Sequence, residues 1–400
     1  MSSAGEGALS LIFLVAGEPS GDQVGGRLMA ALKRQTGGAV RFSGVGGERM
    51  KEQGLESLFP MEDLSVFGIV EVVPHLPRIL RRMRETVAAV RTMRPDVVVT
   101  IDSPEFSFGI GKRLKGAGIP LIHCVAPQLW AWRPRRARTI SRFLDHILVL
   151  LPFEPPYFEA VGLGCTFIGH PVVESGADKD AGPEFRGRHG IPKDAPVLCI
   201  LPGSRRSETS RLLPVFVETL QLLARDFPGL RGVMPTVSAV EKDVASARWP
   251  IPITVVKGEA EKYSAFAAST VALAASGTVA LELAVAGLPM VVAYKVTPLS
   301  AWVARRMMRV RYATFVNLIL DREVVPELLQ EKCTSPLLAE AVARLLNDGR
   351  ARKAQIDGAR EVALQLGLGR RPPSERGAEV ILDFVNRSSR GSDDAEPSQP

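Results

Sequence analysis

Short apolar runs alternate with helix-forming segments along most of this chain, and no other feature constrains its fold as strongly. Near-continuous apolar runs are typical of parallel strands that are buried on both faces of a sheet. The runs are Leu11–Ala16, Val40–Val45, Val97–Ile101, Leu121–Val125, Ile147–Leu151, Val197–Leu201, Ile251–Val256, Val271–Ala274 and Pro289–Ala293. Because most neighbouring runs are separated by a segment that can hold a helix, the pattern predicts an α/β fold with parallel sheets.

The length of the chain, 400 residues, is enough for two domains with separate cores. The ladder of apolar runs restarts after the segment 175–196, which is rich in Gly, Asp and Pro. We therefore expect two Rossmann-like domains, 1–174 and 197–346, whose parallel sheets face a cleft, with 175–196 as the linker. Residues 347–387 are expected to form C-terminal helices that pack back on the first domain, and the polar residues 388–400 a disordered tail.

The composition limits the cellular compartment in which the protein is expected and the kinds of partner that it is expected to bind. The formal net charge of +7 suits an anionic partner such as a nucleotide, a phosphorylated lipid or a membrane face, and no nucleic-acid-binding module is recognisable. No apolar run approaches the ~18 residues of a membrane-spanning helix, and the run Ala8–Ala16 lacks the basic leader of a signal peptide. The 4 cysteines are scattered, which suits reduced thiols in a cytoplasmic protein rather than a disulfide framework or a zinc site.

A turn of small residues follows one of the buried runs in the second half. Ser276-Gly277-Thr278 lies between the run Val271–Ala274 and a helix-forming segment, so backbone N–H groups would point outward at the positive end of a helix, where a phosphate fits. Glu282 lies four residues past Thr278 on the same helix face, where its carboxylate could accept hydrogen bonds from a ribose. From this stretch alone, a Ser/Thr helix cap beside a surface Glu remains an open alternative.

A second turn in the same expected domain strengthens this interpretation. The run Val197–Leu201 ends in Pro202-Gly203-Ser204-Arg205. Gly203 allows a ligand to approach the backbone closely, and the guanidinium of Arg205 can hold a diphosphate with two hydrogen bonds. Because both turns follow strands of one domain, together they predict a site for a nucleoside diphosphate.

The first half contains two glycine-bearing loops after strands. The loop Gly17–Asp22 carries Glu18, Ser20 and Asp22, and its Ser and Asp are plausible helix caps. A second loop, centred on Gly46, matches no dinucleotide-binding pattern. Glycine loops of this kind are weak signals alone.

Asp102 stands at the C-terminal end of the third apolar run, where α/β enzymes place catalytic groups. Its carboxylate could act as a general base. Glu18, Asp22 and Glu105 are rival carboxylates, and Asp102 could instead cap the following helix. His123 lies inside an apolar run and is expected to belong to the core.

Two segments combine apolar with basic residues, Ser65–Val87 and Pro298–Tyr312. An apolar segment beside a basic helix can rest on an anionic membrane surface, although a buried loop followed by a solvated basic helix would have the same pattern. Trp130 and Trp132 lie in a loop that several arginines follow. This loop suits an amphipathic or glycan-like ligand, or a wedge at a domain interface.

At these motifs the chain resembles the lipid-A-disaccharide synthase family, glycosyltransferases with two Rossmann-like domains (the GT-B fold). The resemblance covers roughly Leu11 to Leu346. The matching motifs are Gly17–Asp22, Gly44–Gly47, Ile101–Phe106, Pro127–Trp132, Phe167–Pro171, Leu201–Arg205, Ala275–Thr278, Asn317-Leu318 and Val325–Gln330.

The resemblance implies that UDP-2,3-diacylglucosamine donates its sugar to 2,3-diacylglucosamine 1-phosphate with inversion, giving a β-1,6-linked disaccharide 1-phosphate and UDP. It implies a peripheral position at the inner membrane, and a homodimer stays open. No metal or other cofactor is implied, because a helix end and an Arg stabilise the leaving diphosphate.

Site roles follow from the resemblance residue by residue. Asp102 becomes the leading candidate for the base. The residues expected around the donor nucleotide are Arg205, Ser276, Gly277, Thr278, Glu282 and Asn317, and for Asn317 the resemblance is the only argument. The acceptor-side candidates are Glu18, Ser20, Asp22, Gly46, Trp130 and Trp132.

Other functions fit parts of the pattern. A UDP-sugar 2-epimerase would use the same fold without a lipid acceptor, but it would not need the apolar and basic segments. A related transferase with an undecaprenyl-linked acceptor lacks this tryptophan loop. A non-catalytic lipid- or nucleotide-binding protein would bind UDP without turnover, and Asp102 would then be incidental.

Overall fold

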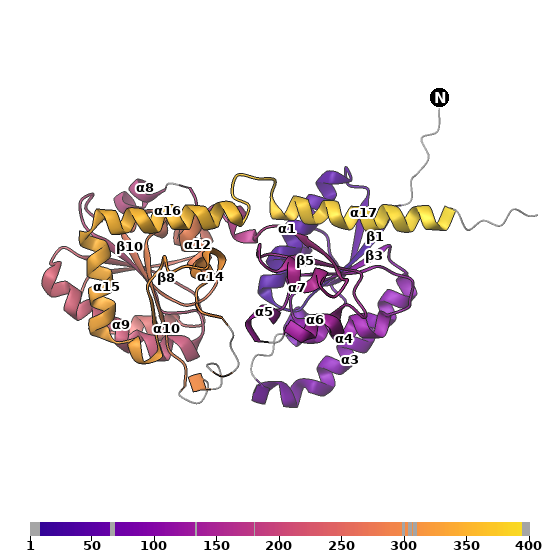
Figure 1. The fold of residues 1–400 in the computed structure, drawn as a ribbon, viewed down its shortest axis with the longest axis horizontal. Helices are drawn as coiled ribbons and strands as arrows, with labels where there is room; N and C mark the ends of the chain where they lie inside the picture. The colour runs from indigo at the N-terminus through magenta and orange to yellow at the C-terminus, as the bar shows by residue number, and fades with distance from the viewer. Residues whose placement is uncertain are drawn as a thin grey trace, which may run out of the picture. The chain divides into compact units, whose positions relative to one another are not determined.

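The computed structural model describes residues 9–64, 69–132, 134–179, 181–297, 301–302, 306 and 310–393. The chain divides into two compact units, Met1–Pro171 with Arg371–Pro400, and Val172–Arg370. Each unit contains a six-stranded sheet whose paired strands all run parallel, and helices cover both faces (Figure 1). The predicted α/β class with two Rossmann-like sheets is confirmed.

The first unit has strand order β2-β1-β3-β4-β5-β6. Its strands are β1 (Ser10–Ala16), β2 (Val40–Val45), β3 (Val97–Ile101), β4 (Leu121–Cys124), β5 (His146–Val149) and β6 (Gly164–Phe167). Its α-helices are α1 (Pro19–Gln35), α2 (Glu48–Glu52), α3 (Ile69–Met93), α4 (Pro104–Leu114), α5 (Leu129–Trp132), α6 (Ala137–Ile140), α7 (Pro155–Glu159) and α17 (Pro373–Asp393).

The second unit has strand order β12-β11-β10-β7-β8-β9. Its strands are β7 (Val197–Leu201), β8 (Arg231–Thr236), β9 (Ile253–Lys257), β10 (Val271–Ala275), β11 (Met290–Tyr294) and β12 (Glu327–Leu329). Its α-helices are α8 (Gly182–Arg188), α9 (Arg206–Asp226), α10 (Glu241–Ser246), α11 (Glu259–Ala267), α12 (Val279–Val285), α14 (Phe315–Leu320), α15 (Ser335–Asn347) and α16 (Gly349–Gln365).

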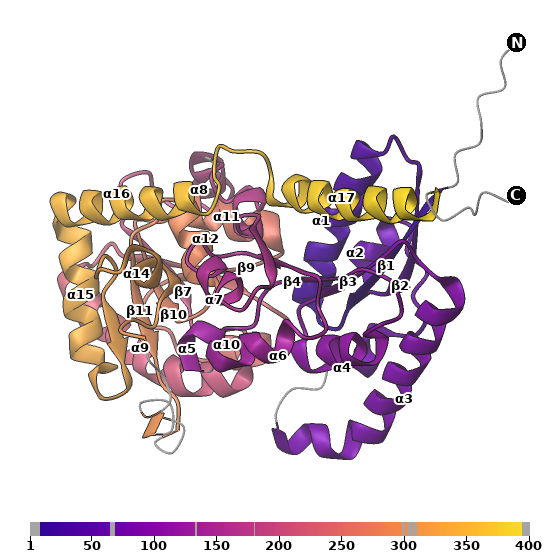
Figure 2. The same cartoon turned by 45° about the vertical axis from the view of Figure 1, so that its right-hand side comes forward.

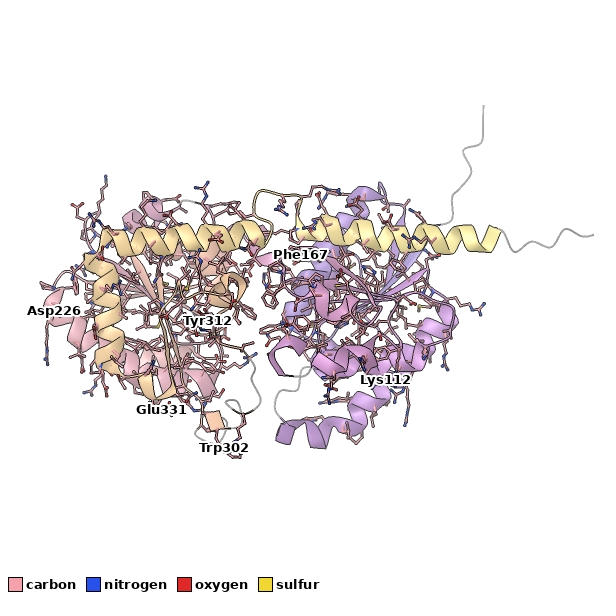
Figure 3. All side chains as sticks on the ribbon, in the orientation of Figure 1. Lys112, Phe167, Asp226, Trp302, Tyr312 and Glu331 are labelled. Atoms are coloured by element: carbon pink, nitrogen blue, oxygen red, sulfur yellow. The ribbon has the colours of Figure 1, made fainter. Side chains whose placement is uncertain are left out.

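The C-terminal helices divide between the two units. Helix α16 belongs to the second unit, whereas α17, yellow in Figure 1, belongs to the first. Ala378 and Ile381 of α17 are completely buried in the core on one face of the first sheet. The guanidinium of Arg376 donates a 2.6 Å hydrogen bond to the carbonyl oxygen of Phe167, which is labelled in Figure 3. Only the second C-terminal helix thus completes the core of the first unit.

Two sequence-based boundaries differ from the structure. The segment 175–196 is part of the second unit and contains α8, and Arg186 joins it to the rest of the unit by a hydrogen bond to the carbonyl oxygen of Ala268. Arg186 also donates to the carbonyl oxygens of Pro192, Lys193 and Ala195 within the segment. The disordered tail was expected from residue 388, but α17 continues to residue 393, since each further residue adds a hydrogen bond to an existing helix. Residues 394–400 lie outside the described residues.

Helix α3 runs along one flank of the first unit beside α4 (Figure 2). It includes most of the segment for which membrane contact was predicted, but residues 65–68 lie outside the described residues, as do 298–300, 303–305 and 307–309 of the second such segment. Among the residues that the structure describes, no helix is both long enough and apolar enough to span a membrane.

Candidate active site

The predicted site residues lie near the point in each sheet from which strands are added in both directions. In the first unit this switch point lies between β1 and β3, because β2 pairs with the other edge of β1. In the second unit it lies between β7 and β10, because β8 and β9 extend one way and β11 and β12 the other. Ligands of open parallel α/β sheets bind at the carboxyl ends of the strands at such points. Each unit therefore presents one candidate ligand-binding edge.

The loops after β1 and β3 pack directly against each other. Ala16 and Ile101 are paired in the sheet, so Gly17 and Asp102 follow neighbouring positions. A Cβ atom at Gly17 would lie 2.6 Å from Oγ of Ser103. Only glycine allows the loops to approach this closely, which explains the first residue of the Gly17–Asp22 motif.

The turn that carries Asp102 has an unusual backbone. Asp102 and Ser103 both lie in the left-handed region, with φ of 55° and 44°. This conformation is strained for residues other than glycine, although Asp tolerates it better than most. The Asp102 N–H donates to the carbonyl oxygen of Cys124 at 3.0 Å, and the Ser107 hydroxyl donates to the Asp102 carbonyl oxygen at 2.7 Å. Hydrogen bonds on both sides thus hold the strained turn in place.

The carboxylate of Asp102 is half-buried and oriented by two donors. Oδ1 accepts a 2.8 Å hydrogen bond from the backbone N–H of Ser103, and Oδ2 accepts a 3.0 Å bond from the hydroxyl of Ser20. Of the rival carboxylates, Glu18 accepts a 3.4 Å hydrogen bond from the Ser103 hydroxyl and lies in the same cluster. Glu105 is exposed and forms an ion pair. Ser20 and Glu18 are therefore brought together with the Asp102 turn.

Asp22 and Gly46, two of the acceptor-side candidates, both pack against the start of α2. Asp22 is buried, and its Oδ1 accepts from the N–H groups of Gly47 at 2.8 Å and Met50 at 3.1 Å, while Oδ2 accepts from Arg49 N–H at 2.9 Å. The carboxylate caps the N-terminus of α2. Gly46 is buried, and a Cβ atom there would lie 2.6 Å from Sδ of Met50. This close packing explains why the second loop carries a glycine at this position.

The tryptophan loop follows β4, next to the Asp102 turn. Trp130 is buried, packs edge-on against Phe153, and its indole Nε1 donates to Oε1 of Glu154 at 3.3 Å. The Trp132 side chain lies outside the described residues. Trp130 therefore anchors its loop through buried contacts.

In the second unit, the two predicted turns follow neighbouring strands. Leu201 of β7 and Ala274 of β10 are paired in the sheet. The backbone N–H of Ser276 donates to the Ala293 carbonyl at 3.1 Å, which anchors the start of the turn, whereas Gly277 and Thr278 are exposed. No atom lies within 4 Å of where a Cβ of Gly277 would be. This turn is open to solvent at the start of α12.

Arg205 stands at the N-cap of α9 with an exposed side chain. Its Nη1 lies 3.3 Å from Oε1 of Glu208. An exposed ion pair of this kind contributes little to stability, so the guanidinium can exchange this partner for a ligand phosphate. Gly203 has φ of 113°, and a Cβ there would lie 2.7 Å from Oε2 of Glu208, so the motif requires glycine.

Glu282 is held by two side chains of α11 that the sequence does not single out. Its Oε1 accepts hydrogen bonds from Nζ of Lys262 at 2.8 Å and from the hydroxyl of Tyr263 at 3.3 Å. Burial lowers the pKa of Lys262, but the carboxylate of Glu282 outweighs burial and raises the pKa above its ordinary value. The ammonium group thus stays charged and fixes the carboxylate in one orientation.

The side chain of Asn317, which is expected around the donor nucleotide, is fully hydrogen-bonded within the second unit. It is completely buried, and its Nδ2 donates to the Val325 carbonyl and to Oε1 of Glu327, each at 2.8 Å. Its Oδ1 accepts from the N–H groups of Val324 at 2.8 Å and Val325 at 2.9 Å. An amide has two N–H donors and two oxygen lone pairs, and all are used. Asn317 positions backbone.

The carboxylate of Glu327, which accepts from Asn317, also accepts hydrogen bonds from the preceding segment of the chain. Its oxygens accept from the N–H of Ala313 at 2.7 Å, and from the N–H and hydroxyl of Thr314 at 2.9 and 2.8 Å. The Ala313 carbonyl accepts in turn from the Ser276 hydroxyl at 3.4 Å. The Asn and Glu motifs therefore build a frame beside the small-residue turn.

The supporting residues Glu327 and Lys262 differ in whether the sequence gives any signal of their role. Glu327 lies within the motif Val325–Gln330, although its role as a hydrogen-bond acceptor could not be foreseen. Lys262 has no local signal, because its partner Glu282 is on a different helix and 20 residues away. Contacts between separate elements are fixed only when the chain folds.

His123 is a core residue, as expected. It is completely buried, and its Nδ1 lies 2.8 Å from the hydroxyl of Thr100. Burial lowers the pKa of His123 to about 3. It is a poor general base for a surface-bound substrate. Among the described residues, no three His, Cys, Asp or Glu side chains gather in a way that could hold a metal ion.

Comparison with known proteins decides the family. A model of the Lipid-A-disaccharide synthetase family matches residues 12–379. The lipid-A-disaccharide synthase of Rhodospirillum centenum is 60% identical over 94% of this chain and 95% of its own length. The protein of the same name from Paramagnetospirillum magneticum is 52% identical over 94% of this chain and 98% of its own. The chain belongs to the lipid-A-disaccharide synthase family. It is a glycosyltransferase of lipid A biosynthesis.

Solved structures share the fold of this family member at low sequence identity. The UDP-GlcNAc 2-epimerase of Neisseria meningitidis, solved with UDP-GlcNAc bound, has a TM-score of 0.63 at 11% identity and covers 94% of this chain and 100% of its own. MurG of Acinetobacter baumannii has a TM-score of 0.55 at 15% identity and covers 94% and 99%. Both an isomerase and MurG thus have this architecture, so the fold alone does not separate the alternatives, and the family does.

Proposed function

We propose that the protein transfers 2,3-diacylglucosamine from its UDP donor to the 6-hydroxyl of 2,3-diacylglucosamine 1-phosphate, giving the β-1,6-linked disaccharide 1-phosphate and UDP. The observation that carries the proposal is the pair of switch points in a chain of this family. One presents an oriented carboxylate, Asp102, and the other an exposed turn of small residues beside Arg205.

In this proposal Asp102 is the general base. Its carboxylate removes the proton of the acceptor hydroxyl as that oxygen forms a bond to the anomeric carbon of the donor. The bond between the anomeric carbon and the diphosphate oxygen breaks on the opposite face, so the configuration inverts and UDP leaves with the electron pair. The two hydrogen bonds from Ser20 and Ser103 keep the carboxylate in place, since each oxygen retains a lone pair for the hydroxyl.

The donor side supplies charge and orientation. Arg205 and the N–H groups of Gly277 and Thr278 would neutralise the developing charge on the diphosphate, which makes a metal ion unnecessary. Oε2 of Glu282 would accept from the ribose, because Oε1 already accepts from Lys262. These contacts are made by residues that are exposed or half-buried in the second unit.

The proposed reaction is tested by product analysis. The protein is incubated with UDP-2,3-diacylglucosamine, with and without 2,3-diacylglucosamine 1-phosphate, and the products are measured by mass spectrometry. We expect UDP and a disaccharide phosphate only when the acceptor is present. A change in the sugar without the acceptor would instead support the epimerase alternative, and UDP binding without any product would support a binding protein.

We also propose that the protein associates peripherally with the cytoplasmic face of the inner membrane. A groove of about 530 Å³ runs between α3 and α4 and is lined by Arg84, Val87, Ala88, Arg91, Thr92 and Arg113. None of its three arginines forms an ion pair with a carboxylate of the described residues, whereas Arg81 and Arg82 of the same helix pair with Glu85. In the second unit, Trp302 is 54% exposed, lies at the outer edge of that unit in Figure 3, and stacks with Arg306.

Vesicle flotation tests this association. We expect binding to vesicles that contain anionic phospholipid at low salt and release at high salt, because each basic residue near such a surface contributes about 1 kcal/mol that salt screens. Arg84→Glu should weaken binding, whereas Arg360→Glu, an equal change of charge at an exposed site on α16, should not. Absence of binding at low salt, or equal effects of the two variants, would contradict the proposal.

A further inference from the structure

Glu154 is a buried carboxyl group that the proposed reaction does not use. It lies in the turn between β5 and α7 and is only 3% exposed. Its Oε2 accepts from the backbone N–H groups of Leu150 at 3.2 Å and Leu151 at 2.9 Å, and its Oε1 accepts from the indole of Trp130 at 3.3 Å. None of the Lys or Arg residues that the structure describes forms an ion pair with it.

A buried carboxyl group without a cationic partner is costly, so its presence calls for a reason. Burial raises the pKa of Glu154 to about 7, against the hydrogen bonds from Leu151, Trp130 and Leu150, which lower it. An apolar side chain would avoid this cost but could not accept from the indole. Glu154 is therefore the group that joins the turn after β5 to the tryptophan loop after β4.

That loop begins beside the Asp102 turn. The Cys124 carbonyl, at the end of β4, accepts the hydrogen bond from the Asp102 N–H. The next residue, Val125, has φ of 75°, a conformation that is strained for a β-branched side chain. Such strain persists only where surrounding contacts hold the chain, and the Trp130 anchor lies five residues further on. The path of the loop past Asp102 is thus fixed at one end by β4 and at the other by Glu154.

We propose that Glu154 is a positioning residue for the acceptor: through Trp130 it holds the loop 125–132 at the carboxyl edge of the sheet, where the loop shapes the surface that receives the acylated sugar phosphate next to Asp102. The inference rests on the proposed function, because it assigns this edge to the acceptor. It also explains why Trp130 is itself buried. The hydrogen bond from the indole to Glu154 holds the loop in place, and the acceptor contacts the other residues of the loop.

Two variants break the contact from opposite sides. In Glu154→Gln the single amide oxygen can keep both backbone N–H groups, which turns the amide NH₂ toward the indole and removes that hydrogen bond. Trp130→Phe retains an aromatic ring for packing against Phe153 but removes the N–H. The matched controls are Glu159→Gln, an exposed carboxylate on α7, and Trp249→Phe, whose indole donates to the Val244 carbonyl in the second unit.

The experiment measures kcat and the KM of each substrate, with thermal unfolding in parallel. We expect Glu154→Gln and Trp130→Phe each to raise the KM of the acceptor about tenfold, the order expected for the loss of one hydrogen bond, with kcat and the KM of the donor within about twofold of wild type. The double variant should be no worse than the poorer single variant, because both remove one contact. The two controls should leave both KM values unchanged.

Several results would overturn the inference. One is a folded Glu154→Gln or Trp130→Phe variant with an unchanged acceptor KM, and another is a double variant in which the effects multiply. A rise in the KM of donor and acceptor alike would mean a general structural role. If Glu154→Gln fails to fold, Trp130→Phe alone decides, since its acceptor KM must still rise. Absence of transfer by the wild-type protein would overturn the proposed function and this inference with it, whereas the other results overturn only the inference.

Discussion

Two strand-to-helix turns, one in each unit, contain a glycine, yet the space beside the two glycines differs. Next to Gly17 after β1, the space that a Cβ would need is taken by the hydroxyl of Ser103 at 2.6 Å. Next to Gly277 after β10, nothing lies within 4 Å of that position. Glycine in a sequence can therefore mark a place where the protein itself packs against the backbone or a place that is open to solvent, and the sequence does not say which.

The same contrast holds for the two candidate edges as wholes. In the first unit, the carboxylate of Asp102 is built in by a strained turn and two hydrogen bonds. In the second unit, Gly277, Thr278 and the side chain of Arg205 are exposed, while buried groups such as Asn317 hold the frame. The first edge is preorganised by protein contacts, and in our proposal a ligand binds the exposed groups of the second. Four substitution experiments test this contrast.

The largest effect is expected at Asp102. Asp102→Asn keeps the size of the side chain and suits the left-handed backbone, but it removes the base. We expect turnover to fall at least ~10²-fold, with UDP affinity and thermal stability nearly unchanged. The matched control is Asp22→Asn, which removes one acceptor from a buried carboxylate that caps α2 and should cost about 1–3 kcal/mol of stability. Near-normal turnover in Asp102→Asn would place the base elsewhere, with Glu18 as the next substitution.

The next effect concerns the ligand-dependent edge. Arg205→Ala should weaken UDP binding roughly 10- to 100-fold, because a charge-assisted contact to the diphosphate is worth about 1.5–3 kcal/mol. Stability should not change, since its ion pair with Glu208 is exposed. Arg206→Ala removes the neighbouring guanidinium, which pairs with Asp243, and serves as the control. UDP titration by calorimetry measures both variants, and equal affinities would remove Arg205 from the donor site.

The glycine comparison can be tested directly with one added methyl group in each turn. Gly17→Ala should destabilise the protein by about 1–3 kcal/mol, because the new Cβ overlaps Ser103. Gly277→Ala should leave stability within about 0.5 kcal/mol but reduce UDP affinity, because the methyl group occupies space that the ligand needs. Denaturant unfolding and UDP titration separate the two outcomes. If Gly17→Ala is as stable as the wild-type protein, or if Gly277→Ala binds UDP normally, the proposed difference between the two turns is wrong.

The smallest expected effect is a pH dependence that belongs to the first unit. The folded pKa of His123, about 3, is below its ordinary 6.5, so its stabilisation is present above pH 6.5 and is lost as pH falls toward 3. Between pH 7 and 5 this costs about 2 kcal/mol. His123→Leu should remove this acid sensitivity, which hydrogen exchange at the β4 amides would report, while β10 amides respond less.

Glu154 provides a control of opposite sign. Its folded pKa, about 7, is above its ordinary 4.5, so its contribution to stability is complete below pH 4.5 and is lost as pH rises to 7. Glu154→Gln should therefore make the protein more sensitive to acid between pH 7 and 5, and His123→Leu less sensitive. If both variants lose the same free energy of unfolding between pH 7 and pH 5, that result would contradict these assignments.

The sequence alone predicts the strands well and the supporting contacts poorly. The apolar runs that end before Asp102, Arg205 and Ser276 correspond to β3, β7 and β10, because burial on both faces leaves a continuous apolar signal. By contrast, the hydrogen bonds from Gly47 N–H to Asp22 and from Arg186 to the Ala268 carbonyl oxygen join residues that are 25 and 82 positions apart in the sequence. No local pattern encodes such pairs, so the sequence showed Asp22 only as a helix cap or an acceptor-side candidate, and the segment around Arg186 as a linker.

What the sequence determined by itself is the family, the parallel sheets and the strand ends at which chemistry is expected, since motifs and hydrophobic periodicity are local properties. What only the tertiary structure decided is the part that each polar group plays there. The carboxylates of Asp22, Asp102 and Glu154 cannot be told apart by type, but they differ in what reaches their oxygens: three backbone N–H groups of α2, two orienting donors at an accessible edge, and an indole from the next loop. A hydrogen bond needs its partners within about 3 Å, and that distance exists only after distant segments have packed together.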